Sequence, residues 1–171
     1  MLIRFDEYMI RDWRDDDAPG IARYADNRKI AKNLRDGFPH PYGLSDAQEF
    51  LSKVRQQDPT TIFAIVSEAE VIGGIGLGLG EDVHRYTAEM GFWLAEPYWG
   101  KGIMTEAVKR FTEFAFDRFD LQRIFAEPYA TNPASARVLE KAGYTLEGIL
   151  RANVIKEGVV LDQYLYALTK E

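Results

Sequence analysis

The stretch Glu89-Met-Gly-Phe-Trp-Leu-Ala-Glu-Pro-Tyr-Trp-Gly-Lys-Gly-Ile-Met-Thr-Glu-Ala-Val108 joins an apolar strand, a turn, a loop and the start of an amphipathic helix. Glycines at positions 100 and 102 bracket the loop. A loop of this kind presents successive backbone N–H groups at the positive end of a helix dipole. The stretch therefore predicts a site for a phosphate or pyrophosphate group.

The composition of the chain limits its possible domain organisation, binding partners and chemistry. Its 171 residues contain no linker or repeat, so we expect a single domain over residues 1–171. The net charge of −6 argues against direct nucleic-acid binding, which needs a basic surface. The absence of cysteine excludes disulfides, thiolate metal sites and cysteine nucleophiles. With no signal peptide or long apolar stretch, we expect a cytoplasmic protein that binds neither a metal nor a membrane.

The pattern of apolar residues predicts alternating strands and helices. Strands are predicted over residues 8–14, 61–66, 71–79, 85–95, 121–127, 144–150 and 159–168, and helices after 15–17, over 30–34, from 45, over 101–117 and from 132 to 143. A turn at Glu157-Gly158 would join the last two strands. This order indicates an α/β fold with a mixed sheet.

Local signals mark several helix ends. Ser45 and Gln48 have the spacing of a capping box, and Asn132-Pro133 is a typical helix start. Gly143 is expected to end the helix that begins there.

The glycine-rich segment Gly73–Gly80 does not fit a nucleotide-binding motif. Leu79 stands where a dinucleotide fingerprint needs its third glycine, and no Gly-Lys-Ser/Thr follows. The segment instead predicts a strand whose glycine face allows another backbone or a ligand to approach closely.

The strand and loop, together with Asn132-Pro-Ala-Ser-Ala-Arg-Val-Leu-Glu-Lys-Ala-Gly-Tyr144, resemble the GNAT superfamily of acetyl-coenzyme A-dependent N-acetyltransferases. Within it the chain looks like the RimJ/RimL branch of ribosomal-protein N-terminal acetyltransferases. The resemblance covers nearly the whole chain and is strongest from Ile72 to Leu150. It implies the GNAT fold, in which helices flank a mixed, largely antiparallel central sheet.

The loop departs from the superfamily pattern at its ends. That pattern has Arg or Gln, two residues, Gly, any residue, and then Gly or Ala. Trp99 and Met104 replace the first and last positions, whereas Gly102 is retained. Because backbone N–H groups bind phosphate whatever side chains they carry, the predicted site survives both departures.

The resemblance implies acetyl-coenzyme A as cosubstrate, with its pyrophosphate on the loop and its pantetheine arm beside the strand. The implied cofactor-binding residues are Phe92, Trp93, Leu94, Trp99, Gly100, Lys101, Gly102, Ile103, Met104, Asn132 and Ser135. Asn132 serves equally well as a simple helix cap, and the two roles do not exclude each other.

Acetyl transfer needs a proton acceptor, because an amine attacks the thioester only when neutral. Glu89 resembles the superfamily's common catalytic glutamate, although it also fits an exposed or salt-bridged strand residue. His84 is a second candidate base, or a surface histidine. Ser135 matches a serine proposed in the RimL-like branch to protonate the thiolate, or is an ordinary first-turn serine. Leu139 and Val154 stand where other members carry a tyrosine acid and a glutamate.

We expect an N-acetyltransferase that acts on a primary amine, at a protein or peptide N-terminus, by direct transfer in a ternary complex. A cysteine-free chain cannot form an acetyl-cysteine intermediate. The alternatives are acetylation of a small amine, such as an antibiotic, polyamine or amino-acid derivative, and a coenzyme A sensor without turnover. The acceptor groove is expected between residues 35–44 and the turn near 156–160. The expected acceptor contacts are Arg35, Phe38, His40 and Tyr42. The sequence fits either a monomer or a homodimer.

Overall fold

The computed structural model describes residues 2–170 and divides into two compact units. The first unit comprises Met1–Gly76 and Phe92–Ile103, and the second comprises Leu77–Gly91 and Met104–Glu171. Two strands, β4 (Val71–Leu79) and β5 (Thr87–Leu94), contribute residues to both units. The expectation of a single domain stays a prediction.

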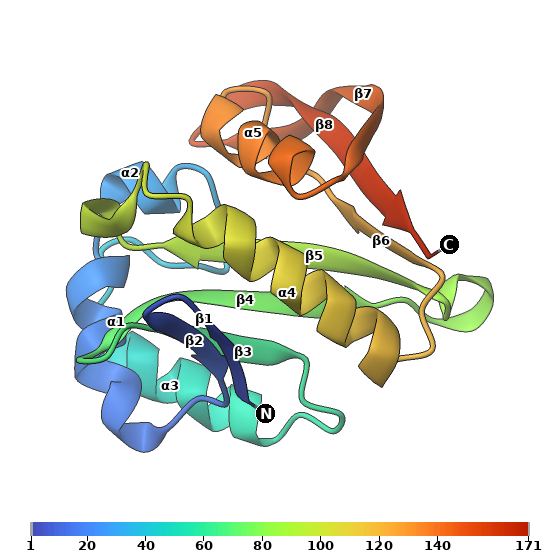
Figure 1. Ribbon diagram of the computed structural model, residues 1–171. Helices are drawn as coiled ribbons and strands as arrows, with labels where there is room; N and C mark the ends of the chain where they lie inside the picture. The colour runs from blue at the N-terminus through green and yellow to red at the C-terminus, as the bar shows by residue number, and fades with distance from the viewer. Residues whose placement is uncertain (1, 171) are drawn as a thin grey trace. The chain divides into compact units, whose positions relative to one another are not determined.

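Antiparallel strands form the sheet of the first unit. In Figure 1, β1 (Leu2–Phe5) and β2 (Tyr8–Arg11) form a hairpin near the N-terminus. β2 pairs with β3 (Ile62–Val66), and β3 pairs with β4. β1 was not predicted, and β2 ends at Arg11 rather than at the predicted residue 14. Four residues with a charge in third place carry too little alternation to be recognised as a strand.

The helices of the first unit are α1 (Ala18–Ala25), α2 (Arg28–Ala31) and α3 (Leu44–Arg55), with the 3-10 turn η1 (Asp15–Asp17) before α1. The predicted capping box of α3 is wrong. The helix begins one residue earlier, and the backbone N–H of Gly43 donates to Asp46 Oδ2 at 2.7 Å. An acceptor three residues into the helix therefore caps it without Ser45 or Gln48.

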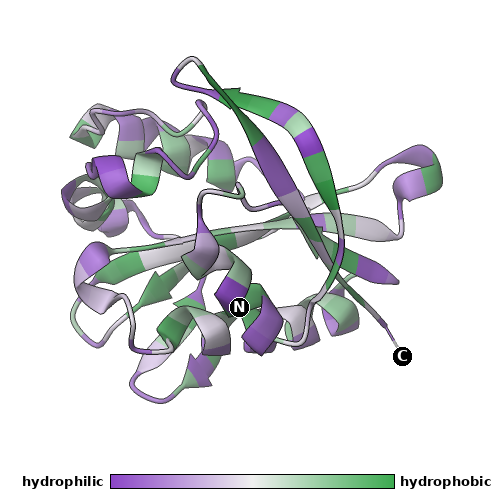
Figure 2. Ribbon diagram, turned by 90° about the horizontal axis from the view of Figure 1, so that it is seen from above, coloured by the Kyte–Doolittle hydropathy of each residue, from purple (hydrophilic) through white to green (hydrophobic). Residues whose placement is uncertain are grey.

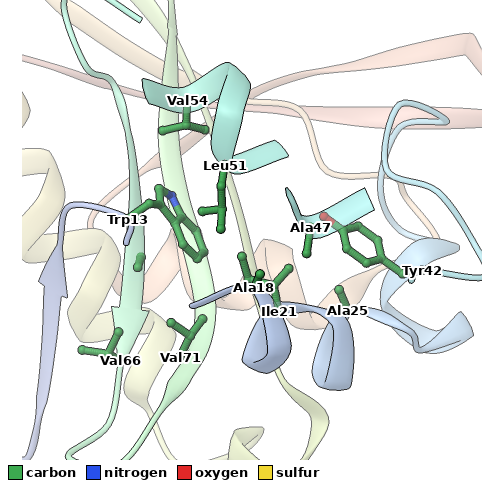
Figure 3. Close-up of a cluster of buried hydrophobic side chains, with 11 residues drawn as sticks. Trp13, Ala18, Ile21, Ala25, Tyr42, Ala47, Leu51, Val54, Val66 and Val71 are labelled. Carbon is green, nitrogen blue, oxygen red and sulfur yellow. The ribbon is translucent and has the colours of Figure 1, made fainter. Parts of the chain in front are cut away.

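Apolar side chains from α1, α3 and the sheet form the core of the first unit (Figure 3). Its buried members are Trp13, Ala18, Ile21, Ala25, Tyr42, Ala47, Leu51, Val54, Ala64, Val66 and Val71. Each large aliphatic side chain among them contributes about 1.5–3 kcal/mol by leaving water. This core holds α1 and α3 in place beside the strands.

The glycine face of β4 admits close neighbours, as predicted. Gly73 lies on the other face of the strand, with Ile75, and a Cβ built there would overlap the carbonyl oxygen of Trp93 on β5. A Cβ on Gly74 would lie 2.9 Å from Trp93 Nε1 and 3.1 Å from Trp13 Cζ2. Glycine at these positions therefore leaves room for a neighbouring backbone and for two indole rings.

Gly73→Ala should lower the free energy of unfolding by about 2 kcal/mol, because the added methyl group meets backbone rather than a flexible side chain. For a chain of this length the unfolding midpoint should fall by roughly 4–8 °C, which calorimetry would measure. Gly91→Ala is the matched control, since no atom lies within 4 Å of a Cβ built there. Equal midpoints for the two variants would contradict this explanation.

The second unit combines helices with a mixed set of strands. β5 pairs in parallel with β6 (Arg123–Ala126), which pairs antiparallel with β8 (Val159–Thr169). β8 pairs with β7 (Thr145–Lys156) in a long hairpin. Figure 2 shows hydrophobic and hydrophilic stretches alternating along this hairpin. The predicted turn is confirmed, with left-handed φ values of 50° at Glu157 and 78° at Gly158.

Two helices belong mainly to the second unit. α4 (Ile103–Arg118) buries the apolar stripe that includes Val108 and Phe111, and α5 (Pro133–Lys141) follows β6. Gly143, with φ of 94°, ends α5 as predicted. Within residues 2–170, no helix has the length and apolar character that crossing a bilayer requires.

Within residues 2–170 the strands have the order β1-β2-β3-β4-β5-β6-β8-β7. The β5–β6 pair is parallel, whereas β1–β2, β2–β3, β3–β4, β6–β8 and β7–β8 are antiparallel. The prediction of an α/β fold with a mixed, largely antiparallel sheet is confirmed.

Candidate active site

A glycine-bracketed loop joins β5 to α4. The strand ends at Leu94, the 3-10 turn η3 (Glu96–Tyr98) follows, and α4 begins at Ile103. Gly100 and Gly102 have left-handed φ values of 74° and 79°, and no atom lies within 4 Å of a Cβ built on either. Backbone conformation, rather than space, therefore requires glycine at both positions.

This loop has the properties of an anion site. Alternation of left-handed and ordinary backbone turns successive N–H groups toward one side, which makes a concave donor surface. The first N–H groups of α4 lack partners inside the helix and carry the positive end of its dipole. Lys101, which is exposed between the two glycines, adds a positive charge. The arrangement suits a phosphate or pyrophosphate group.

Trp99 anchors the loop to the preceding strand. Its indole Nε1 donates to the carbonyl oxygen of Leu94 at 2.7 Å. The neighbouring Ala95 N–H donates to the carbonyl oxygen of Ile72 on β4, also at 2.7 Å. The tryptophan that departs from the superfamily pattern thus ties the loop back to the end of β5.

Side chains from α1, α2 and β2 brace η3. Glu96 accepts a hydrogen bond from Asn27 Nδ2 at 2.7 Å and forms an ion pair with Lys29. The ring of Tyr98 meets Tyr8 and Tyr24 edge-on, at centroid distances of 6.5 and 6.3 Å. These contacts hold the start of the loop in place before any ligand binds.

The brace at Glu96 should weaken in acid. The hydrogen bonds from Lys29 and then Asn27 hold the pKa of Glu96 below its ordinary value of 4.5. A lowered folded-state pKa means that the stabilisation is present above pH 4.5 and is lost as the pH falls through the folded value. Glu96→Gln should therefore unfold at a lower temperature than wild type at pH 7, and this difference in unfolding temperature should become smaller below pH 4.5. A difference that does not change with pH would contradict this role.

β5 carries the predicted base and the predicted pantetheine contacts. Glu89 is half-buried and lies opposite Phe125 of β6, while Phe92 and Trp93 are half-buried and Leu94 is buried. All four residues thus belong to a single strand.

In the second unit, Asn132 caps α5. Its Oδ1 accepts from the backbone N–H of Ser135 at 3.3 Å, and both side chains are half-buried. The predicted cap is confirmed, and a further role toward a cofactor stays a prediction.

Met104, in the first turn of α4, is buried, so only its backbone N–H is available to a ligand at the surface.

The loop of residues 35–43 brings one predicted acceptor residue beside the strand. The ring centroid of Phe38 lies 5.9 Å from that of Trp93 and 5.0 Å from that of Tyr42. Tyr42 itself is buried in the core, and burial raises its pKa to about 12. Its ring therefore supports the loop from beneath. Arg35 and His40 are exposed.

Asp26 has a role in this loop that the sequence did not predict. Its Oδ1 accepts from the backbone N–H of Tyr42 at 3.0 Å and lies 3.6 Å from His40 Nδ1. One carboxylate thus holds two positions of the loop. Its partners stand 14 and 16 residues further on, beyond the reach of local patterns.

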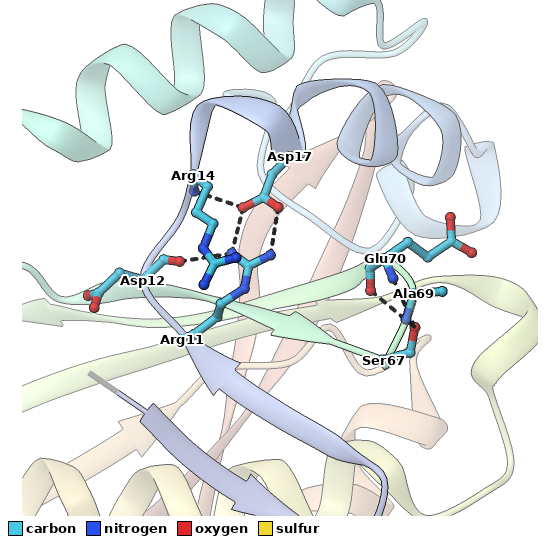
Figure 4. A network of polar contacts seen from close by, with 7 residues as sticks. All are labelled: Arg11, Asp12, Arg14, Asp17, Ser67, Ala69 and Glu70. Carbon is cyan, nitrogen blue, oxygen red and sulfur yellow. Dashed lines mark hydrogen bonds and ion pairs between the residues drawn. The ribbon is translucent and has the colours of Figure 1, made fainter.

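The first unit also contains a cavity of about 700 Å³ that is separate from the loop of residues 95–102. It includes the ion pair of Arg11 and Asp17 and none of the predicted site residues. Figure 4 shows the guanidinium of Arg11 donating to both carboxylate oxygens of Asp17, at 2.7 and 2.8 Å. The backbone N–H of Arg14 donates to the same carboxylate at 2.8 Å. These bonds fasten η1 to β2.

A family model described as "Acetyltransferase (GNAT) domain" matches residues 8–145. The chain belongs to this family. Over 82 residues it is 46% identical to the probable N-acetyltransferase YjcK of Bacillus subtilis, covering 48% of this chain and 45% of the relative. Over 114 residues it is 31% identical to the ribosomal-protein-serine acetyltransferase of Escherichia coli, covering 67% and 63%. Both matches span less than two thirds of the relative's length.

Solved structures agree with the fold. RimL, the ribosomal L7/L12 alpha-N-protein acetyltransferase in complex with coenzyme A, superposes with a TM-score of 0.88 at 19% identity, covering 99% of this chain and 98% of RimL. The resemblance to the GNAT superfamily and its RimJ/RimL-like members is thereby confirmed. The prediction of an acetyl-coenzyme A-dependent acyltransferase agrees with this family.

Proposed function

We propose that this chain transfers the acetyl group of acetyl-coenzyme A to a primary amine. The observation that carries the proposal is the braced loop between β5 and α4, with its two left-handed glycines. Such a loop is a backbone donor site for a pyrophosphate, and coenzyme A contains one. The complex of RimL with coenzyme A supports the same ligand here.

Backbone groups hold most of the cofactor in this proposal. The backbone N–H groups of residues 100–104 hold the pyrophosphate, with Lys101 adding charge. The backbone of Phe92–Leu94 lies along the pantetheine arm, as an added strand would. The side chain of Asn132 donates a hydrogen bond to the cofactor through its amide nitrogen, because its oxygen already caps α5.

Two side chains transfer protons in this mechanism. Glu89 accepts a proton from the attacking amine, directly or through a water, as the new C–N bond forms. Ser135 donates its hydroxyl proton to the sulfur when the C–S bond breaks, and solvent restores that proton. A backbone N–H near Leu94 stabilises the negative charge on the carbonyl oxygen. Because the chain has no cysteine, transfer is direct rather than through an acetylated thiol.

The favoured acceptor is the N-terminal amine of a protein or peptide. The ribosomal-protein-serine acetyltransferase, a relative over two thirds of this chain, supports this acceptor class. The ring of Phe38, beside Trp93, offers an apolar surface for a residue next to the amine.

Mass spectrometry of reacted acceptors tests this assignment. The panel should contain peptides with free and blocked N-termini, alongside polyamines, aminoglycosides and amino acids. Acetylation confined to the free α-amine of peptides is the expected result. If a small amine were acetylated faster than every peptide, the proposed acceptor class would be wrong, whereas the proposed acetyl transfer would still hold.

A further inference from the structure

The β7–β8 hairpin contains a bulge with its own polar network. Leu150 pairs with Gln163 and Val154 pairs with Leu161, so three residues of β7 stand opposite Asp162 alone. The middle one, Ala152, has a left-handed φ of 49°, and its N–H donates to Asp162 Oδ1 at 2.7 Å. The carboxylate therefore holds the bulge in one conformation.

Gln163 links this bulge to a different segment of the second unit. Its Oε1 accepts from Asn153 Nδ2 at 2.7 Å, and its Nε2 donates to the carbonyl oxygen of Glu127 at 2.7 Å. Its side-chain orientation is fixed, because a carbonyl can only accept. Gln163 is 4% exposed, so losing either bond would leave a partly buried polar group unsatisfied.

The segment that Gln163 holds leads to the cap of α5. Beyond β6, the backbone of residues 128–130 continues to pair with β8. Tyr164 N–H donates to the carbonyl of Pro128 at 3.0 Å, and Ala130 N–H donates to that of Asp162 at 2.9 Å. Asn132 N–H then donates to the carbonyl of Tyr129 at 2.8 Å. A series of hydrogen bonds thus connects the bulge to Asn132, the residue proposed to bind the cofactor.

We propose that Gln163 is a positioning residue that couples the hairpin bulge to the Asn132 cap, and so to the placement of acetyl-coenzyme A. Nothing in the sequence singles out this glutamine. A glutamine on a strand is ordinarily exposed, whereas this one is buried with its amide used at both ends. The coupling to coenzyme A rests on the proposed function, whereas the coupling to Asn132 does not.

Gln163→Leu tests the coupling in the apo protein. The variant loses both side-chain hydrogen bonds of Gln163. Hydrogen exchange should therefore accelerate at least about fivefold at Ala130 and Asn132 and in the bulge together, since fivefold is the effect of one net hydrogen bond. Thr112→Val is the matched control, since it removes another buried bond in the same unit, to Tyr144 at 2.8 Å. Unchanged exchange at Ala130 and Asn132 in Gln163→Leu would overturn the proposal. So would the same acceleration there in Thr112→Val.

Gln163→Glu separates positioning from general destabilisation. It retains the acceptor for Asn153 but, when ionised, has no proton for the carbonyl of Glu127. The dissociation constant for coenzyme A, from calorimetry across pH, should be about fivefold above wild type where this buried acid is ionised and should return toward wild type at lower pH, where the protonated acid donates again. A constant ratio to wild type across pH would overturn the link to cofactor placement. If wild type itself does not bind coenzyme A, the proposed function fails while the exchange experiment still decides the coupling to Asn132.

Discussion

Glu89→Gln should lower kcat roughly 100- to 1,000-fold and leave the dissociation constant of acetyl-coenzyme A within about twofold of wild type. Glutamine has nearly the same shape but cannot take the proton of an attacking amine. Residues 92–94 and 100–104, which are assigned to the cofactor, are unchanged. Steady-state rates with a good acceptor, together with calorimetric binding, measure the two effects separately.

Glu113→Gln provides the control, because Glu113 is an exposed glutamate on α4 outside the proposed site. It should match wild type in both measurements. A Glu89→Gln enzyme with wild-type kcat would remove Glu89 as the base and direct attention to His84, which is exposed near the start of the same strand.

Gly102→Val should weaken acetyl-coenzyme A binding about 50-fold. A β-branched residue at a φ of 79° is strained by about 1–3 kcal/mol, so the loop would relax and turn its N–H groups away from the ligand. No atom lies near a Cβ at this position, so the effect comes from backbone conformation and not from a clash. Calorimetric titration with acetyl-coenzyme A measures the change.

Gly143→Val is a matched control for backbone strain. Its φ is 94°, its added Cβ also meets open space, and it lies at the opposite end of α5 from Asn132. It should lower the unfolding temperature without weakening the cofactor complex. Equal losses of affinity in the two variants would indicate general destabilisation and contradict the assignment of the loop.

Features set by neighbouring residues were predictable from the sequence. The bounds of β4 are those predicted, because alternating glycine and aliphatic residues define a strand closely. Asn132-Pro133 and Gly143 mark α5 for the same reason, since caps depend on a few adjacent residues.

Features set by distant partners were not predictable. Glu96 is braced by Asn27 and Lys29, which stand 69 and 67 residues away. The bulge depends on the carboxylate of Asp162, which is ten residues from Ala152. The alternation of apolar and polar residues does not predict this bulge. The core position of Tyr42 likewise follows from the packing of α1 and α3 against it. Tertiary contact decides such roles, so a single sequence leaves them open.

Release of coenzyme A, followed with a thiol reagent, tests acetyl transfer most directly, because the chain has no thiol of its own. Wild type should be given acetyl-coenzyme A with and without an N-terminal peptide. Release that requires the peptide, and that falls with Glu89→Gln, is the predicted result. Tight binding of acetyl-coenzyme A with no release for any peptide or small amine would contradict the account and indicate a sensor.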